Sequence, residues 1–298
     1  MAATLYPPAL TIPLYAIFTA IGIILTSLRF WVRLSYEPRL YNGRKLYLDD
    51  LFIVLGLLVT CSCTGIQFHN AIDGASGEVV TGGHVKSEVA IVEHKVDFTM
   101  IVIEKLSFGA VKLSLLYFYR RLFGNMGHFK RINNLLIWLV ALWTVSFFLA
   151  DLLLCGLHPE LQWALDQMLA RKGCGDKGGL LIAFAATSVL TDGAVLLLPL
   201  LYVQKLKLRH SEMIAVSVIF TLGGLSTVAG VLRTIFLCVA YPMGRITFGW
   251  VAPPFDETPL ILRVFNPTFF AMLEMLLGVW AANLPVISPL VFFRKVGV

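Results

Sequence analysis

The sequence predicts an all-α, multi-pass membrane protein, a bundle of seven transmembrane helices. The first observation is composition: 58% of the 298 residues are hydrophobic and only 14% are charged, whereas soluble domains carry about 25% charged residues. The second is that the apolar residues gather into long runs, because a helix needs roughly 20 of them to cross a bilayer. Alternating runs of about ten residues, which are typical of membrane β-barrels, do not occur in the sequence.

Seven apolar runs predict seven helices within one membrane domain that takes in residues 1–298. They lie at 10–33, 50–72, 96–119, 133–155, 179–203, 212–240 and 266–292. The third run is the most polar, because it contains Asp97, Glu104, Lys105 and Lys112. The first 28 residues contain no Lys or Arg, so we expect the first helix to act as a signal anchor rather than as a cleaved signal peptide.

The basic residues predict the orientation. More Lys and Arg residues fall on the side of the loops after the first, third and fifth helices than on the opposite side. Cytosolic loops carry this excess, so the N-terminus is expected outside the cytosol and the C-terminus inside. The net charge of +6 is spread over helix ends rather than gathered in one patch, which argues against nucleic-acid binding.

Ionisable residues inside the membrane runs mark the candidate site, because such groups are costly in a bilayer and usually functional. The candidates are Asp97, Glu104, Asp192, Arg233 and Glu274, with Lys105, Lys112 and Asp151 nearby in the runs. Asp97 and Glu104 are seven residues apart and share one helix face. With the expected orientation, these residues come from separate helices to similar depths and predict a polar pocket reached from the outer side. Alternatively, Arg233 neutralises Asp192 or Glu274 as a structural ion pair.

The five cysteines suggest one disulfide and no metal site. Cys155 and Cys174 flank the outer loop between the fourth and fifth helices, on a side that is oxidising if it faces the lumen or the exterior. A bridge between them and two free thiols both remain open. No spacing of Cys and His residues resembles a metal site, and no cofactor is expected.

Several segments together resemble the fungal rhodopsin-domain membrane family, whose members include receptor-like proteins and proteins of secondary-metabolite clusters such as that for satratoxin. The resemblance spans nearly the whole chain and rests on order and spacing. The segments are Leu48–Leu51, Lys112–Ser114, Phe118–Phe123, Cys155, Pro159, Trp163, Gly173–Cys174, Asp192, Leu198–Pro199, Gly223–Gly224, Arg233, Glu274, Pro285 and Pro289. It does not imply retinal, because the run at 266–292 has no Lys to form a Schiff base.

Within this family, the chain is similar to the membrane-bound terpene cyclase of ascofuranone biosynthesis. Receptor-like members carry a long cytosolic tail, whereas this sequence is expected to end soon after its last helix, at Phe293–Val298. The resemblance implies a fungal terpene cyclase, of isomerase or lyase type, that cyclises a prenylated aromatic (meroterpenoid) epoxide. A location in the endoplasmic reticulum follows from that hypothesis.

The enzyme hypothesis assigns roles to the candidate residues. A lipophilic substrate would enter from the bilayer. Burial penalises the charged form of a carboxylic acid, so Glu104 or Asp192 is expected to donate a proton to the epoxide. Glu274 and Asp97 would be its partners and Arg233 an orienting residue. Aromatic faces could stabilise positive charge by cation–π contact, from Phe108, Trp143, Phe147, Phe148 and Phe184.

The alternative is a receptor-like or transport protein that binds a small ligand through the same residues. In that hypothesis, the acids and Arg233 bind a polar ligand or form an ion pair that switches between two states. Arg120 and Arg121, at the inner end of the third helix, would then contact a signalling partner. The sequence leaves this alternative and the oligomeric state open.

Overall fold

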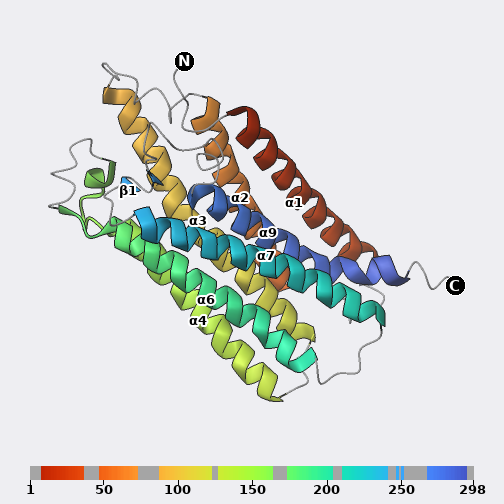
Figure 1. Cartoon of the computed structure of the whole chain (residues 1–298). Coiled ribbons are helices and arrows are strands. Elements are labelled where there is room, and N and C mark those ends of the chain that lie inside the picture. The colour runs from red at the N-terminus through yellow and green to blue at the C-terminus, as the bar shows by residue number, and fades with distance from the viewer. Residues whose placement is uncertain are drawn as a thin grey trace.

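A computed structural model describes residues 8–36, 47–72, 87–122, 127–163, 173–203, 210–240, 246–247, 250–251 and 267–293. These ranges contain seven long α-helices, which run along one another as a bundle (Figure 1). The helices are α1 (Pro8–Tyr36), α2 (Leu48–Ile72), α3 (Ser87–Leu122), α4 (Gly127–Leu152), α6 (Lys177–Val203), α7 (His210–Ala240) and α9 (Pro267–Phe293). The described part also contains a 3₁₀ helix, η3 (Pro159–Trp163), and a pair of two-residue strands, β1 (Ile246–Thr247) and β2 (Trp250–Val251).

Six of these helices are long and apolar enough to span a membrane, so the predicted all-α, multi-pass membrane fold is confirmed. The exception is α3, which carries the largest number of predicted ionisable residues. Its Glu104, Lys105 and Lys112 side chains are buried against other helices. The hydropathy of α3 is therefore low because its polar groups face protein rather than lipid.

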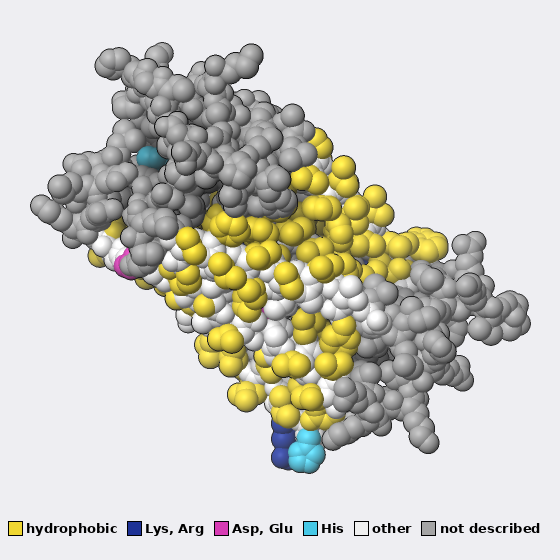
Figure 2. Space-filling view, viewed as in Figure 1, with side chains coloured by type: hydrophobic (Ala, Val, Ile, Leu, Met, Phe, Trp, Pro, Cys, Tyr) yellow, Lys and Arg dark blue, Asp and Glu magenta, His cyan; other side chains and the backbone are white. Residues whose placement is uncertain are grey.

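Two helices form the centre of the bundle. Helix α3 packs against α2, α4, α6 and α9, and α9 packs against α1, α2, α3 and α7. The exposed large apolar side chains lie mainly on the surrounding helices, for example Ile24 on α1 and Trp138 on α4. Figure 2 shows hydrophobic side chains over the middle of one face of the molecule. This apolar surface is what a membrane-embedded bundle presents to lipid.

Two helices begin well before the predicted runs because polar turns extend them beyond their apolar parts, and one helix ends earlier than predicted. Helix α3 begins at Ser87 rather than at residue 96. Helix α4 begins at Gly127 rather than at residue 133 and ends at Leu152 rather than at residue 155. Hydropathy finds only the part of a helix that lies in hydrocarbon, so it misses such polar turns. After α4 the chain turns through Gly156, which has a φ of 65°, a left-handed conformation that suits glycine.

A disulfide joins the segment after α4 to the segment before α6. The structure pairs Cys155 with Cys174, with Cα atoms 4.0 Å apart. The backbone N–H of Gly175 also donates to the carbonyl of Leu154 at 2.9 Å. On the same end of the bundle, Trp163 of η3 packs against Phe98 of α3 with ring centroids 5.8 Å apart. This covalent link and the packing of η3 close the end of the bundle at which the candidate site lies.

Candidate functional site

A first cavity lies between α3, α6, α7 and α9, towards the end of the bundle that carries η3. It has about 500 Å³ of empty space, including the part open to solvent. Three predicted site residues, Asp97, Glu104 and Arg233, line it, and the rest of its wall is mostly apolar. The other lining residues are Met100, Ile101, Leu181, Phe184, Leu237, Pro267, Thr268 and Ala271. The cavity therefore combines an apolar wall with a few ionisable groups, as small-molecule sites commonly do.

One lysine, Lys105, forms ion pairs with two acids beside this cavity. The Nζ of Lys105 lies 2.7 Å from Oε1 of Glu104 and 3.1 Å from Oδ2 of Asp151 on α4. It also donates to the carbonyl of Ile101 at 2.6 Å. All three charged side chains are buried, and that of Lys105 has no exposed surface. Of the two acids, Glu104 lines the first cavity.

Aromatic rings surround the buried cations. Phe184 stacks on Trp143, with ring centroids 5.0 Å apart, and packs edge-to-face against Phe108 and Phe147. Lys105 Nζ lies 4.7 Å and Arg233 Cζ 5.3 Å from the centroid of Phe184. Five aromatic residues were expected to stabilise positive charge on a substrate. Four of them form one cluster, and this cluster contacts the side-chain cations of the protein itself.

A second cavity lies deeper between the same four helices and contains Lys112, Asp192 and Glu274. It has about 520 Å³ of empty space, including the part open to solvent. The Nζ of Lys112 lies 3.2 Å from Oδ1 of Asp192 and donates to Ser188 Oγ at 3.0 Å. The Ser188 hydroxyl in turn donates to Oε1 of Glu274 at 2.9 Å. A continuous polar chain thus runs from α3 through α6 to α9.

The five predicted residues are divided between two adjacent cavities rather than gathered in one pocket. Asp97, Glu104 and Arg233 line the first cavity, whereas Asp192 and Glu274 line the second. The two cavities are linked by an ion pair in which Arg233 Nη1 lies 3.5 Å from Oε2 of Glu274. Arg233 therefore pairs with Glu274 rather than with Asp192, because Lys112 already neutralises Asp192.

Asp97 is half-buried, as is Asp192, whereas Glu104, Arg233 and Glu274 are buried. Its Oδ1 accepts a hydrogen bond of 3.0 Å from Asn70 Nδ2 on α2. It lies two helical turns from Glu104 on α3, and both residues line the first cavity. This arrangement fits the shared helix face expected from their spacing of seven residues.

The buried charges do not balance when every group is ionised. Four acids, Glu104, Asp151, Asp192 and Glu274, face three cations, Lys105, Lys112 and Arg233, in the ion pairs of the described residues. Nearer the end of the bundle, Lys177 interacts electrostatically with Asp151 and with Asp97, so Lys177 and Asp97 add one charge of each sign. An uncompensated charge is costly away from water. One proton shared among these carboxyl groups would make the cluster neutral.

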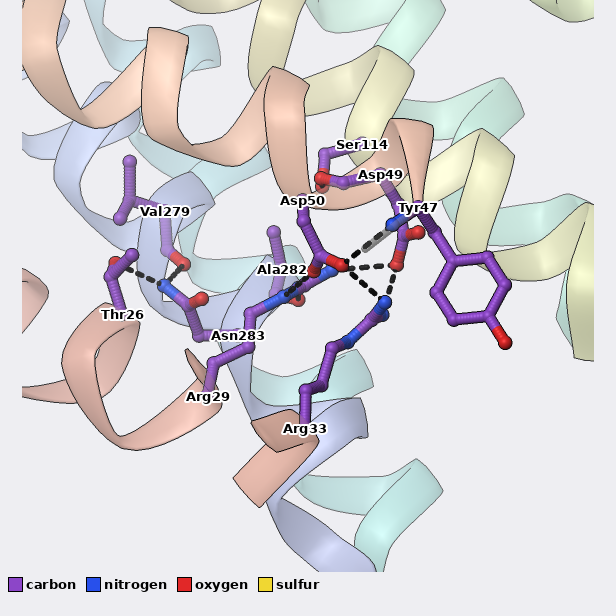
Figure 3. Close-up of polar contacts among 10 residues, drawn as sticks. All are labelled: Thr26, Arg29, Arg33, Tyr47, Asp49, Asp50, Ser114, Val279, Ala282 and Asn283. Atoms are coloured by element: carbon purple, nitrogen blue, oxygen red, sulfur yellow. Dashed lines mark hydrogen bonds and ion pairs between the residues drawn. The ribbon is translucent and has the colours of Figure 1, made fainter. Parts of the chain in front are cut away.

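A second buried charge cluster, which was not predicted from the sequence, lies at the opposite end of the bundle. Figure 3 shows Arg29 and Arg33 of α1 directed towards Asp49 and Asp50 at the start of α2. All four side chains are buried. The four-residue spacing of the two arginines, which places them on one helix face, was the signal that could have identified the cluster.

The cluster also joins α3 and α9. Arg29 Nη1 donates to the carbonyl of Ala282 on α9 at 2.7 Å, and Ser114 Oγ on α3 donates to the carbonyl of Asp49 at 2.8 Å (Figure 3). Asn283 Nδ2, one residue along α9, donates to Thr26 Oγ1 of α1 at 2.9 Å. The residues at this end therefore bind four helices together, and neither cavity reaches them.

Comparison with known proteins places these features in a family context. The sequence pattern of the fungal rhodopsin domain matches residues 28–292. The chain is similar to the wortmanamides biosynthesis cluster protein C of Talaromyces wortmannii, with 26% identity over 235 residues, 77% of this chain and 60% of the relative. It is also similar to the phomoidride biosynthesis cluster protein H of a fungal species, strain ATCC 74256, with 27% identity over 166 residues, 47% of this chain and 57% of the relative.

The chain thus spans less than two thirds of the length of these curated relatives. No solved structure matches it.

Proposed function

We propose that this chain, which belongs to the fungal rhodopsin domain family, is a membrane-embedded enzyme of fungal secondary metabolism that cyclises a lipophilic prenylated aromatic epoxide. The observation that carries the proposal is the sharing of Lys105 between Glu104 and Asp151 beside a mostly apolar cavity. The names of both relatives, each a biosynthesis cluster protein, support a role in secondary metabolism.

The shared lysine supports Glu104 as the acid. Lys105 and Lys177 are the two cations beside the three acids Glu104, Asp151 and Asp97, so one proton placed among these acids would make the group neutral. Glu104 lines the first cavity beside Lys105, where it can reach a substrate. After Glu104 gives up its proton, the nearby Lys105 stabilises the carboxylate that remains.

The reaction then needs only proton transfers and a rearrangement of bonds. Glu104 donates its proton to the epoxide oxygen while one carbon–oxygen bond of the epoxide breaks. The electron pair of a neighbouring alkene forms the new carbon–carbon bond and leaves a carbocation. Asp97 on the same cavity wall accepts the proton that the carbocation loses, and an alkene forms. The product is an isomer of the substrate, and solvent returns the proton from Asp97 to Glu104.

Arg233 has a positioning role in this proposal. It lines the first cavity and is held by Glu274 and by the faces of Phe108 and Phe184, at 4.9 and 5.3 Å. A guanidinium fixed in this way can donate a hydrogen bond to an oxygen of the substrate. The substrate is lipophilic and reaches the cavity from the bilayer, which for such a pathway enzyme is that of the endoplasmic reticulum.

A receptor-like function is the second candidate, and the Arg233–Glu274 pair favours it. The pair joins α7 to α9 across 3.5 Å, and Glu274 Oε2 makes no hydrogen bond within the described residues. A ligand in the first cavity that attracted Arg233 could release Glu274 and shift α7 against α9. In that case ligand binding would change the helix arrangement without consuming the ligand.

Expression in a fungal host that makes a prenylated aromatic epoxide tests the proposal. Extracts are compared with an empty-vector control by mass spectrometry and NMR. We expect a new isomer of equal mass, which is lost in Glu104→Gln while the protein still reaches the membrane. Glu160→Gln is the matched control, because the Glu160 side chain is 60% exposed. If purified protein converts no such epoxide but changes conformation on binding it, the receptor-like function replaces this one.

A further inference from the structure

The second cavity is lined by polar groups that make no hydrogen bond within the described residues and have no role in the proposed reaction. Within the described residues, Tyr119 Oη, Asp192 Oδ2 and Glu274 Oε2 have no hydrogen-bond partner, and all three residues line this cavity. Tyr119 is 4% exposed and Glu274 is 2% exposed. Glu274 Oε2 keeps its ion pair with Arg233 at 3.5 Å, so Tyr119 Oη and Asp192 Oδ2 are the two groups without a partner within the described residues. An unsatisfied buried polar group costs about 1–3 kcal/mol, and these two groups around one cavity point to a bound ligand.

The donors of Lys112, which lie nearest to Asp192, are already in use. Lys112 has three N–H groups, and four oxygen atoms already surround its Nζ within 3.2 Å. The hydroxyl group of Ser226 donates to the carbonyl of Glu274 at 3.0 Å. The free oxygen of Asp192 therefore requires a donor from a ligand, while Tyr119 offers its own O–H and accepts in return.

Charge and depth limit the class of ligand. Lys112 and Arg233 balance Asp192 and Glu274 in their ion pairs, so a charged ligand would upset a neutral site. Asp192 lies in the middle of the membrane-spanning helix α6, yet 16% of its side chain remains accessible. The remaining wall is largely apolar, with residues such as Phe108, Leu115 and Met275. The ligand must therefore be neutral, mainly apolar and able to donate hydrogen bonds.

We propose that the second cavity binds a neutral hydroxylated lipophile, whose hydroxyl group donates to Asp192 and accepts from the O–H of Tyr119. Two sources supply this chemistry: a sterol of the surrounding membrane and a hydroxylated aromatic metabolite. The site lies below the first cavity and is distinct from it, since Arg233 and Glu274 form the boundary. It does not require the reaction proposed above.

Photolabelling of the full chain in phosphatidylcholine nanodiscs tests this site. The probe is hexadecanol carrying a diazirine, and the comparison is its methyl ether, which cannot donate a hydrogen bond. Mass spectrometry of peptides locates the label. We expect the alcohol to label the segments of α3, α6, α7 and α9 that line the second cavity several-fold more than the ether does. Equal labelling by the two probes would overturn the proposal.

A conservative variant makes the test specific. Tyr119→Phe removes one hydroxyl group and keeps the ring, so it should weaken binding of the alcohol by roughly two- to tenfold. Tyr202→Phe is the matched control, because Tyr202 packs on Phe129, with ring centroids 5.0 Å apart, and does not line the cavity. If both variants bind the alcohol as the unchanged protein does, Tyr119 is not part of a site and the proposal fails.

Competition identifies the source of the ligand. Ergosterol represents the membrane and a prenylated phenol represents the metabolite. Loss of labelling with ergosterol alone assigns the site to a membrane sterol, and loss with the phenol alone assigns it to a metabolite. Displacement by both supports recognition of the shared chemistry. Failure of both to displace the alcohol would contradict a site for hydroxylated lipophiles.

Discussion

Arg29 Nε donates to Asp50 Oδ1 at 3.0 Å, although the two residues are 21 positions apart and lie on different helices. Arg33 contacts both Asp49 and Asp50, and Arg29 Nη2 donates to Asp49 Oδ2 at 2.7 Å. Each arginine therefore bonds to both aspartates. This doubly paired cluster, with two charges of each sign, links α1 to α2 at the end of the bundle opposite the first cavity.

Asp50→Asn should destabilise the protein strongly. The variant leaves two buried guanidinium groups with one carboxylate, and breaking a buried ion pair by removing one partner costs about 3–5 kcal/mol. Thermal unfolding in detergent micelles measures the effect. Glu160→Gln, a change at an exposed position, should leave the unfolding temperature unchanged. Equal unfolding temperatures for the two variants would show that the Arg29–Asp50 contact adds no stability.

Asp151→Asn should reduce the proposed cyclase activity even though Asp151 does not line the first cavity. Without the second acid, Lys105 pairs with Glu104 alone and favours its ionised form, which cannot donate a proton. We expect at least a tenfold loss of product formation relative to the unchanged protein. Product formation equal to that of the unchanged protein would separate Asp151 from the proton donor.

Gly109→Ala should destabilise the contact between α3 and α4. A Cβ atom at this position would lie 2.1 Å from Thr144 Oγ1 and 2.8 Å from Thr144 Cβ, so one helix must shift. Overpacking of this kind costs about 1–3 kcal/mol. Gly65→Ala is the control, because its Cβ would meet nothing within 4 Å and alanine favours the helix. The unfolding temperature should fall for the first variant only.

Reduction of the Cys155–Cys174 disulfide should lower stability. The two cysteines are 19 residues apart, and closing a loop of about this length contributes about 3 kcal/mol in the chain-entropy account. Unfolding is followed with and without a reducing agent. The double variant Cys155→Ser/Cys174→Ser should unfold at the lower temperature in both conditions. A response to the reducing agent that persists in this variant would place the effect at other cysteines.

The membrane class and the approximate helix positions were predictable because they depend on composition. A run of about 20 apolar residues has a strong preference for hydrocarbon wherever it occurs in a chain, and six of the helices meet this condition. The outward orientation of the N-terminus stays a prediction from the basic residues. The ends of α3 and α4 were less predictable, because polar turns such as those after Ser87 and Gly127 continue a helix without an apolar signal.

The candidate residues could be identified from the sequence because ionisable groups are energetically costly in a bilayer. Their ion-pair partners could not be identified in this way. An acid or base within an apolar run stands out in any sequence, so Glu104, Asp192 and Glu274 were identified as polar residues of the bundle. The sequence did not reveal the second charge cluster, which consists of Arg29, Arg33, Asp49 and Asp50. These residues lie near the ends of the apolar runs, where charged residues usually face water or headgroups. Their burial depends on the contact of α1 with α2 and α9.

The sequence by itself determined that this is a helical membrane protein with ionisable groups inside its bundle, because these properties follow from the local order of apolar and charged residues. Only the tertiary structure decided which charges meet: Lys105 lies between Glu104 and Asp151, Lys112 joins Asp192, and Arg233 joins Glu274. The same residues form two cavities rather than one. The physical reason is that an ion pair depends on the rotation and depth of two separate helices, and packing over the whole bundle sets both.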